Sequence, residues 1–253
     1  MPNQPQPPAG AGQQSLWFNP PDGQENRRRT LTREQVVAEA LTIIGTDGAG
    51  ALSMRGLAAR LGVVPGALYR HVRSKEQLCD LAVDEVLAEV DIRTDRAPGW
   101  AGQVKALARL LRAVLEDHPG IAGLLKTRDP LGPHSLALAE AFLTALQEAG
   151  LPQRETAQAF SLVYDYTLGF ALSDRTTVNE QRVQDPAIRR QLHAFFRSLP
   201  ADRFPALAVL GEHVWAGNRD QRFTAGLDTL LAGLQAAGLQ AASQRPHRRQ
   251  PGR

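Results

Sequence analysis

Apolar residues recur at helical spacing through almost the whole stretch between residues 31 and 238. Positions three and four apart share one face of a helix, so this spacing lets each segment bury one side. The stretch contains no run of alternating β-branched residues bounded by turn signals, which is the pattern of a strand. The sequence therefore predicts an all-α fold.

The first helix of this stretch has a clear start and a clear end. Thr32 and Gln35 form a capping box, in which each side chain bonds the other residue's backbone amide. Gly45 or Gly48 is expected to end the helix, because glycine tolerates the left-handed backbone of a C-terminal cap. The expected buried face consists of Val36, Val37, Ala40, Leu41 and Ile44.

A pair of short helices follows, joined by the tight turn Gly62-Val63-Val64. Ser53 is the expected N-cap of the first helix, and Gly62 is its C-terminal glycine. Pro65 suits the first position of the second helix, where a missing backbone N–H costs nothing. The expected inner face of the first helix is Leu57, Ala58 and Leu61.

A longer helix comes next, and further helices fill most of the remaining chain. Ser74 and Gln77 form a second capping box, which opens a helix that runs to about Val90. Beyond Pro98, proline and glycine breaks separate the later segments. These helices are predicted at 99–117, 120–126, 134–149, 153–176, 186–198, 203–215 and 220–238.

Basic residues concentrate in the same segment as the short helix pair. Between Arg27 and Lys75 there are nine basic residues and three acidic ones, whereas the whole chain has 29 and 26. Two short helices at a tight turn, braced by a longer preceding helix, are typical of a DNA-binding helix-turn-helix. The local charge supports this interpretation, because DNA phosphates attract a basic surface.

The string from Leu52 to Leu78 resembles the tetracycline-repressor family. That family's signature of Leu-Tyr-x-His with a lysine shortly after it is matched by Leu68-Tyr69-Arg70-His71 and Lys75. The resemblance covers about residues 30–85, and residues 165–175 look like the corresponding helix of the Tet repressor's C-terminal domain. It implies a helical homodimer that represses transcription by holding palindromic double-stranded DNA, and that lets go when a small-molecule inducer binds.

The recognition helix can be interpreted residue by residue. Leu68 and Val72 are four positions apart and are expected to point inward, which leaves their neighbours facing DNA. Arg70 is the candidate to read guanine, because a guanidinium makes paired hydrogen bonds to that base. Ala67 is suited to a thymine methyl group, and Gly66 allows close backbone approach.

Resemblance to the family adds phosphate contacts by Tyr69, His71 and Lys75, with Ser53 and Arg55 in similar roles. Phosphate contacts set the docking register rather than the sequence preference. Residues 27–29, three arginines, are either an arm that neutralises phosphates or a charged junction. The predicted DNA-binding residues are Ser53, Arg55, Pro65, Gly66, Ala67, Tyr69, Arg70, His71 and Lys75.

These assignments divide the chain into four parts. Residues 1–26 are rich in proline, glutamine and glycine and are predicted to form a disordered tail. Residues 27–92 are the predicted DNA-binding domain, and residues 93–240 the predicted ligand-binding and dimerisation domain. Residues 241–253 are expected to be a second, basic tail.

Two long helices of the predicted second domain have faces that look too apolar for lone surface helices. The resemblance implies that the helices at 153–176 and 220–238 pair with their symmetry mates in a four-helix dimer interface. A purely intramolecular core is the alternative interpretation.

The resemblance also implies a ligand pocket among the middle helices of this domain. A largely apolar cavity with few polar groups is the usual form of such a site. Aligned with the Tet repressor, the magnesium-binding histidine falls on Leu124 and its acidic partner on Ser173, so neither a metal nor another cofactor is expected. The candidate ligand-binding residues are Trp100, Leu124, Arg128, Phe142, Phe160 and Tyr164.

An enzyme is the rival class of protein, and its motifs are missing. The sequence has no G-x-S-x-G, no H-E-x-x-H, no P-loop and no G-x-G-x-x-G between a strand and a helix. Repression and activation stay open as alternatives, because the sign of regulation depends on where the operator lies. A single cysteine, Cys79, and charges in every long apolar stretch indicate a soluble, cytoplasmic protein with no membrane partner.

Overall fold

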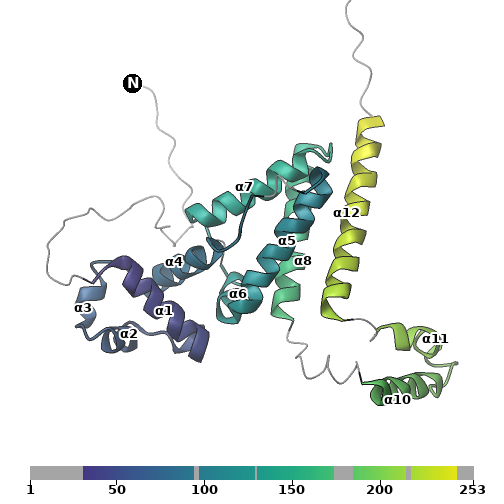
Figure 1. The fold of residues 1–253 in the computed structure, drawn as a ribbon, viewed down its shortest axis with the longest axis horizontal. Coiled ribbons are helices and arrows are strands. Elements are labelled where there is room, and N and C mark those ends of the chain that lie inside the picture. The colour runs from purple at the N-terminus through teal and green to yellow at the C-terminus, as the bar shows by residue number, and fades with distance from the viewer. Residues whose placement is uncertain (1–30, 94–96, 129, 174–184, 215–217, 244–253) are drawn as a thin grey trace, which may run out of the picture. The chain divides into compact units, whose positions relative to one another are not determined.

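A computed structural model of the chain describes residues 31–93, 97–128, 130–173, 185–214 and 218–243 (Figure 1). Within these ranges the regular structure is helical, with eleven α-helices and no strand, which confirms the all-α prediction. The predicted tail 1–26, the arginines at 27–29, the end of the predicted helix 153–176 and residues 244–253 lie outside the described residues.

The helices follow the predicted segments closely. They are α1 (Arg33–Asp47), α2 (Met54–Arg60), α3 (Pro65–Leu68), α4 (Lys75–Leu87), α5 (Gly99–Asp117), α6 (Pro119–Leu125), α7 (Pro133–Gln147), α8 (Gln153–Leu172), α10 (Pro186–Arg197), α11 (Pro205–Val214) and α12 (Arg219–Ser243). A short 3₁₀ helix at Ala49–Ala51, which the sequence analysis did not predict, joins α1 to the helix pair.

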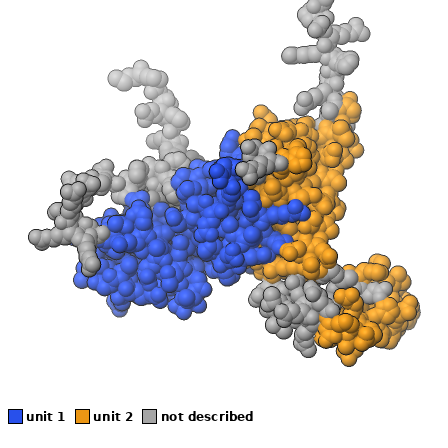
Figure 2. Space-filling model, viewed as in Figure 1, with its two compact units in different colours: residues 1–96, 109–142 blue, residues 97–108, 143–253 orange. Residues whose placement is uncertain are grey.

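The chain forms two compact units (Figure 2). Unit 1 contains residues 1–96 and 109–142, and unit 2 contains residues 97–108 and 143–253. This grouping places α6, with parts of α5 and α7, in the same unit as α1 to α4. It does not follow the boundary predicted between residues 92 and 93, which stays a prediction.

Helix α1 begins at the predicted capping box. The amide of Gln35 donates to Thr32 Oγ1 at 3.2 Å, and the amide of Thr32 donates to Gln35 Oε1 at 3.0 Å. The C-cap is Gly48, whose φ of 81° favours glycine. The buried face is Val36, Val37, Ala40, Ile43 and Ile44. Leu41, predicted to be buried, is only half-buried, and Ile43, which was not predicted, is buried.

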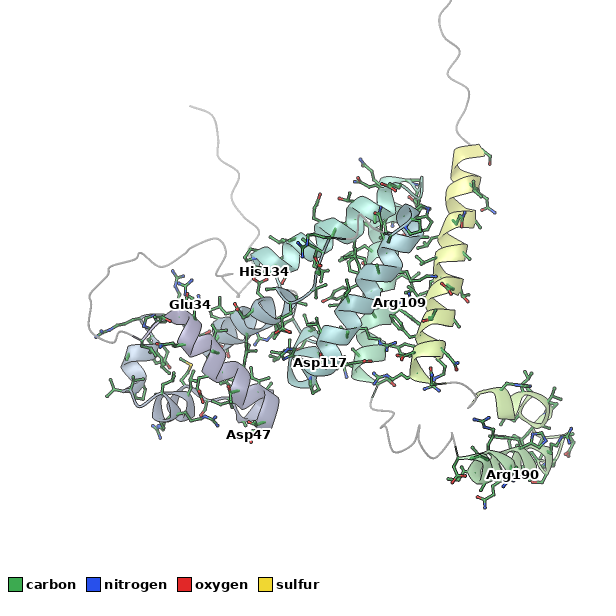
Figure 3. All side chains as sticks on the ribbon, in the orientation of Figure 1. Glu34, Asp47, Arg109, Asp117, His134 and Arg190 are labelled. Carbon is green, nitrogen blue, oxygen red and sulfur yellow. The ribbon has the colours of Figure 1, made fainter. Side chains whose placement is uncertain are left out.

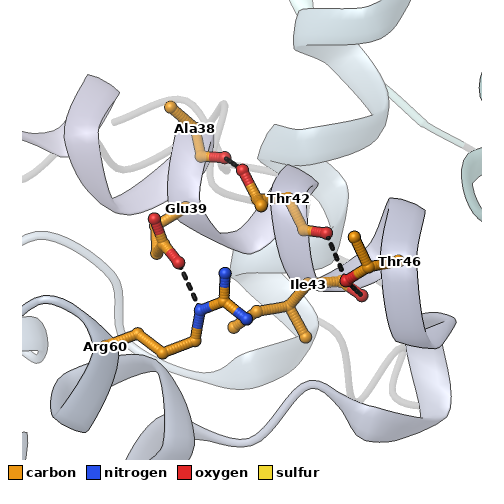
Figure 4. Close-up of polar contacts among 6 residues, drawn as sticks. All are labelled: Ala38, Glu39, Thr42, Ile43, Thr46 and Arg60. Atoms are coloured by element: carbon orange, nitrogen blue, oxygen red, sulfur yellow. Dashed lines mark hydrogen bonds and ion pairs between the residues drawn. The ribbon is translucent and has the colours of Figure 1, made fainter.

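Polar contacts along α1 connect it to α2 (Figure 4). Glu39 forms an ion pair with Arg60 of α2, so that the two helices are held together at their outer edge. Thr42 and Thr46 donate their hydroxyls to backbone carbonyls one turn earlier in α1. The side chain of Arg60 is therefore paired with a residue of the same chain.

Helix α4 begins as predicted but with a different capping pattern. The amide of Gln77 donates to Ser74 Oγ at 3.2 Å. The side chain of Gln77 accepts from the amide of Arg73 instead of completing the predicted capping box with Ser74. The helix ends at Leu87, short of Val90, which is nevertheless buried.

In unit 2, aromatic rings join α8 to α12. Tyr166 stacks on Phe223 with ring centroids 5.5 Å apart, and Phe170 meets the same ring edge-on at 5.2 Å. The hydroxyl of Tyr166 donates to the carbonyl of Phe223 at 3.0 Å. Gly226 makes room for that hydroxyl, since a Cβ there would lie 2.1 Å from it.

Helix α12 is longer than the helix predicted at 220–238. It continues through Ser243 and so includes residues 241–243, which were predicted as the start of the tail. Gly238 lies inside this helix. A Cβ at this position would lie 2.1 Å from the carbonyl oxygen of Ala149, so the glycine allows close packing and does not end the helix.

Candidate nucleic-acid interface

The turn between α2 and α3 has the geometry of a helix-turn-helix. Gly62 follows α2 with a φ of 67°, as predicted for its C-terminal glycine. The amides of Gly62 and Val63 donate to carbonyls in the last turn of α2, at 3.2 and 3.0 Å. Leu57 of α2 and Leu68 of α3 are both fully buried, so the angle between the two helices is fixed by packing.

Helix α3 is short, and the chain continues beyond it as a tight turn. The helix ends at Leu68, and the amides of Arg70 and His71 donate to the carbonyls of Ala67 and Leu68, at 3.4 and 2.9 Å. Val72 is buried as predicted. Arg70 and His71 therefore lie in the turn that follows the helix, and not in its last regular turn.

The predicted DNA-binding residues lie on the outside of this corner. Most are exposed, and the other three are half-buried. The exposed residues are Ser53, Arg55, Pro65, Gly66, Tyr69 and Arg70, and the half-buried ones are Ala67, His71 and Lys75. Ser53 also caps α2, because its Oγ accepts from the amide of Gly56 at 3.1 Å.

Sequence reasoning missed one residue of this surface, Val64. It is the N-cap of α3, and 71% of its surface is exposed although its side chain is apolar. Val64 was predicted only as part of the turn Gly62-Val63-Val64 and was given no role. The signal that was available is its place directly before Pro65, because a proline at the first helical position makes the preceding residue the N-cap.

Burial and a nearby cation lower the pKa of His71. Burial lowers the pKa of the His71 imidazole, and the cation of Arg33 lowers it further, with Glu34 acting in the opposite direction. Glu34 lies in the first turn of α1, where its own backbone amide lowers the pKa of its carboxyl (Figure 3). The first turn of α1 thus forms part of the electrostatic environment of the interface.

Three polar contacts connect α4 and the residues just after it to other parts of unit 1. Asp84 is 3% exposed and accepts from the amide and the hydroxyl of Ser135, at 2.9 and 2.8 Å. Its other oxygen lies 3.4 Å from the amide of His134, which Figure 3 shows at the start of α7. The positive end of the α7 helix dipole also stabilises a carboxylate at these amides.

The second and third contacts lie on either side of Asp84 along the chain. Arg128 donates to Asp80 Oδ1 at 2.6 Å and to the carbonyl of Glu76 at 3.1 Å. Beyond the end of α4, Glu89 lies 3.1 Å from His118 Nε2. A displacement of α4 would therefore have to move or break contacts to the segments before α6 and before α7.

The predicted ligand-binding residues are divided between the two units, with Leu124, Arg128 and Phe142 in unit 1 and Trp100, Phe160 and Tyr164 in unit 2. Phe142 is fully buried, and Arg128 is bound to Asp80. Phe160 and Tyr164 lie together in α8, with ring centroids 5.7 Å apart. Trp100, Leu124, Phe160 and Tyr164 are half-buried.

Metal-ligating residues are not grouped in the part of the chain that the structure describes, where no three His, Cys, Asp or Glu side chains come together. Among the described helices, none combines the length and hydropathy that crossing a bilayer requires.

Two family models match the chain. Residues 36–81 match the bacterial regulatory proteins of the tetR family, and residues 94–237 match the tetracyclin repressor-like C-terminal domain. The first match contains α2, α3 and the turn between them. Together the two matches cover both the candidate interface and most of the chain after it.

Relatives and solved structures agree with these matches. An HTH-type transcriptional regulator from Saccharopolyspora erythraea is 35% identical over 228 residues, which are 89% of this chain and 94% of the relative. The transcriptional repressor DrrR1 of Streptomyces coeruleorubidus is 31% identical over 225 residues, 87% of this chain and 83% of the relative. The crystal structure of apo ActR from Streptomyces coelicolor matches with a TM-score of 0.71 and 35% identity, covering 85% of this chain and all of ActR. The same protein solved with actinorhodin matches at 0.70 and 34% identity, covering 82% and 98% of the two chains.

Proposed function

Because the chain belongs to the TetR family of bacterial transcriptional regulators, we propose that it binds a two-fold symmetric operator as a homodimer and releases it when a small molecule binds. The observation that carries the DNA-binding half is the α2–α3 corner. Its inner side chains are fully buried, and the side chains around its turn are exposed beside a surplus of basic residues. A rigid corner of this kind places a recognition helix in the major groove.

Contacts to phosphates and contacts to bases are expected to divide between residues. Lys75, at the first position of α4, and Tyr69 are suited to phosphates, which orient the protein but carry no sequence information. Arg55, Arg70 and Arg73 are exposed arginines around the corner, while Arg60 is bound to Glu39. We assign base reading by hydrogen bonds to Arg70, because guanidinium groups pair with guanine in the major groove.

Binding to operators selected from random DNA tests this division. Lys75→Ala is expected to weaken binding to all sequences and to reduce the salt-dependence slope by about one. Arg70→Ala is expected to relax the preference at one base pair per half-site, at a cost of roughly 1–3 kcal/mol. Arg190→Ala, which removes an exposed arginine on α10, is the matched control and should bind like the parent. Failure to select any specific sequence contradicts the proposed function.

The ligand half of the proposal rests on the C-terminal match and on the aromatic residues of unit 2. ActR, the structural relative, has been solved with actinorhodin and with (S)-DNPA. We assign this chain an apolar or aromatic ligand, contacted by Trp100 of α5 and by Phe160 and Tyr164 of α8. Aromatic side chains contribute large contact areas and favourable ring packing to such a guest.

Release by the ligand requires a difference in affinity between two states of the protein. A ligand that binds the DNA-incompetent state better shifts the equilibrium, and equal affinity for both states shifts nothing. Helix α4 is the proposed lever, because it begins beside the helix-turn-helix and carries the contacts of Asp80 and Asp84. A coupling free energy of about 1–3 kcal/mol would weaken operator binding roughly 5- to 150-fold.

Operator release measured by fluorescence anisotropy, with actinorhodin as the probe, tests the ligand half. We expect the same release with and without EDTA, because leucine occupies the position of the magnesium-binding histidine. Phe160→Ala and Tyr164→Ala should raise the actinorhodin concentration needed for release and leave operator affinity in its absence unchanged. Release that requires magnesium contradicts the metal-free site.

A further inference from the structure

The side chains that α3 presents outward have no hydrogen-bonding group. Val64 and Pro65 are exposed and apolar, Gly66 is exposed and has no side chain, and Ala67 is half-buried. Leu68 completes the helix and is fully buried. In a helix-turn-helix, the first residues of this helix are the ones that contact base edges. Arg70 follows α3, so the outward residues of α3 and its N-cap themselves offer bases only methyl and methylene groups.

One base edge in the major groove offers an apolar partner for such groups, the C5-methyl group of thymine. The other groups there are hydrogen-bond donors or acceptors, which an apolar side chain would desolvate without replacing their bonds. Val64 is well suited to a methyl contact, because its branched side chain is restricted in rotation and loses little entropy on binding.

The cationic and polar side chains that hold DNA flank this apolar group on both sides along the chain. Arg55 precedes it in α2, and Tyr69 and Arg70 follow it directly after α3. All three are exposed. Along the chain, Val64 therefore lies between residues to which we assign DNA contacts.

We propose that Val64 determines part of the operator preference by packing against a thymine methyl group in each half-site, with Ala67 extending the same apolar contact. This inference rests on the proposed DNA-binding function and adds the chemical group that is read. It predicts an operator in which at least one thymine per half-site is required for its methyl group and not for its hydrogen bonds.

Replacing thymine by deoxyuridine removes only that methyl group, so it provides a direct test. Each thymine of an operator selected by the full chain is exchanged for deoxyuridine, symmetrically in both half-sites. Loss of one buried methyl corresponds to about a fourfold loss of affinity per half-site. We expect this loss at one position at least with the parent protein.

The variant Val64→Ala is tested with the same thymine and deoxyuridine operators, which completes a double-mutant cycle. It should bind the thymine operator with a similar loss per half-site, and the sensitive deoxyuridine exchange should then have almost no further effect. Val209→Ala is the matched control, because Val209 in α11 is 70% exposed, almost as much as Val64, and lies outside the interface. Circular dichroism of each variant establishes that the fold is retained.

Two results overturn the inference. One is a parent protein that tolerates deoxyuridine at every position, and the other is a Val64→Ala variant that keeps the parent's full sensitivity to the exchange. Both leave sequence-specific binding intact, so they contradict the methyl contact alone. A chain that selects no operator contradicts the DNA-binding function on which the inference rests.

Discussion

The imidazole of His71 is half-buried in the turn after α3. Burial lowers its pKa below the ordinary value of 6.5, and Arg33 lowers it further. The folded protein therefore binds fewer protons at this site than the unfolded chain does. The free energy of unfolding therefore loses nothing through His71 above about pH 6.5, and it decreases as the pH falls from there towards the lowered pKa.

This sign gives a prediction for His71→Gln. The melting temperature of the parent should fall when the pH is lowered from about 7 to about 5, and part of that fall should vanish in the variant. Differential scanning calorimetry across this range measures both curves. Parallel curves for the two proteins contradict the assigned burial of the imidazole.

Asp84 is the buried carboxylate with the most contacts in the described part of unit 1. Asp84→Ala leaves the amides of His134 and Ser135 and the hydroxyl of Ser135 without their acceptor. Because bonds to a charged acceptor are strong and buried donors are costly to leave unpaired, we expect a loss of about 2–3 kcal/mol. Ser135→Ala removes only the hydroxyl bond and should cost about 1 kcal/mol.

Urea unfolding at pH 7 measures these losses. Glu85→Ala is the matched control, since Glu85 is the next residue of α4 and is exposed. It should change the free energy of unfolding by no more than about 0.5 kcal/mol. Equal effects of the Asp84 and Glu85 substitutions would show that the contact to Ser135 contributes nothing.

At the scale of whole elements, the contact between α1 and α6 depends on a glycine. A Cβ on Gly120 would lie 2.5 Å from the carbonyl oxygen of Ile44 and 2.7 Å from its Cγ2. Gly120→Ala should therefore force the two helices apart and cost about 1–3 kcal/mol. Gly123 lies in the same helix with nothing within 4 Å of an added Cβ.

Gly123→Ala is accordingly the control and is expected to be neutral or to stabilise by up to about 1 kcal/mol, because alanine is the better helix former. Thermal unfolding of both variants gives the comparison. If Gly120→Ala is as stable as Gly123→Ala, the close contact with Ile44 is not present in solution.

Helices and their caps were predictable because they depend on neighbours in the sequence. The capping box of Thr32, the glycine cap at Gly62 and the start of α3 at Pro65 involve residues within a few positions of one another. The cap at Gln77 shows where prediction from neighbouring residues fails. Its side chain had two amides within reach, those of Ser74 and Arg73, and sequence alone did not decide between them.

Contacts between distant segments were not predictable. Arg128 was a ligand candidate by sequence, and its bond to Asp80, 48 positions away, became visible only in the folded chain. The close approach of Gly238 to Ala149 is equally remote in sequence and could not be predicted either. Val64 was missed for a different reason, since valine is more often buried than exposed.

At the scale of the whole molecule, α8 and α12 bear on the proposed dimer. Part of each predicted apolar face is used within the chain, because Val163 and Thr167 of α8 and Phe223 and Leu227 of α12 are buried without a partner subunit. The intramolecular alternative is thus correct for these side chains. Other leucines of the two helices remain open to solvent, and among them Leu162 of α8 is 45% exposed.

We therefore predict that Leu162→Arg shifts the protein from dimer to monomer. A buried, unpaired cation is costly at an apolar interface, so the dimer should dissociate. Because a single helix-turn-helix contacts only one half-site, loss of the dimer should also sharply reduce operator affinity. Light scattering at micromolar concentration and operator titration measure the two effects. Leu136→Arg on α7 is the matched control, because Leu136 is 52% exposed and lies outside both helices. It should remain dimeric and bind the operator, and a parent protein that is itself monomeric would contradict the symmetric operator as well as the α8–α12 interface.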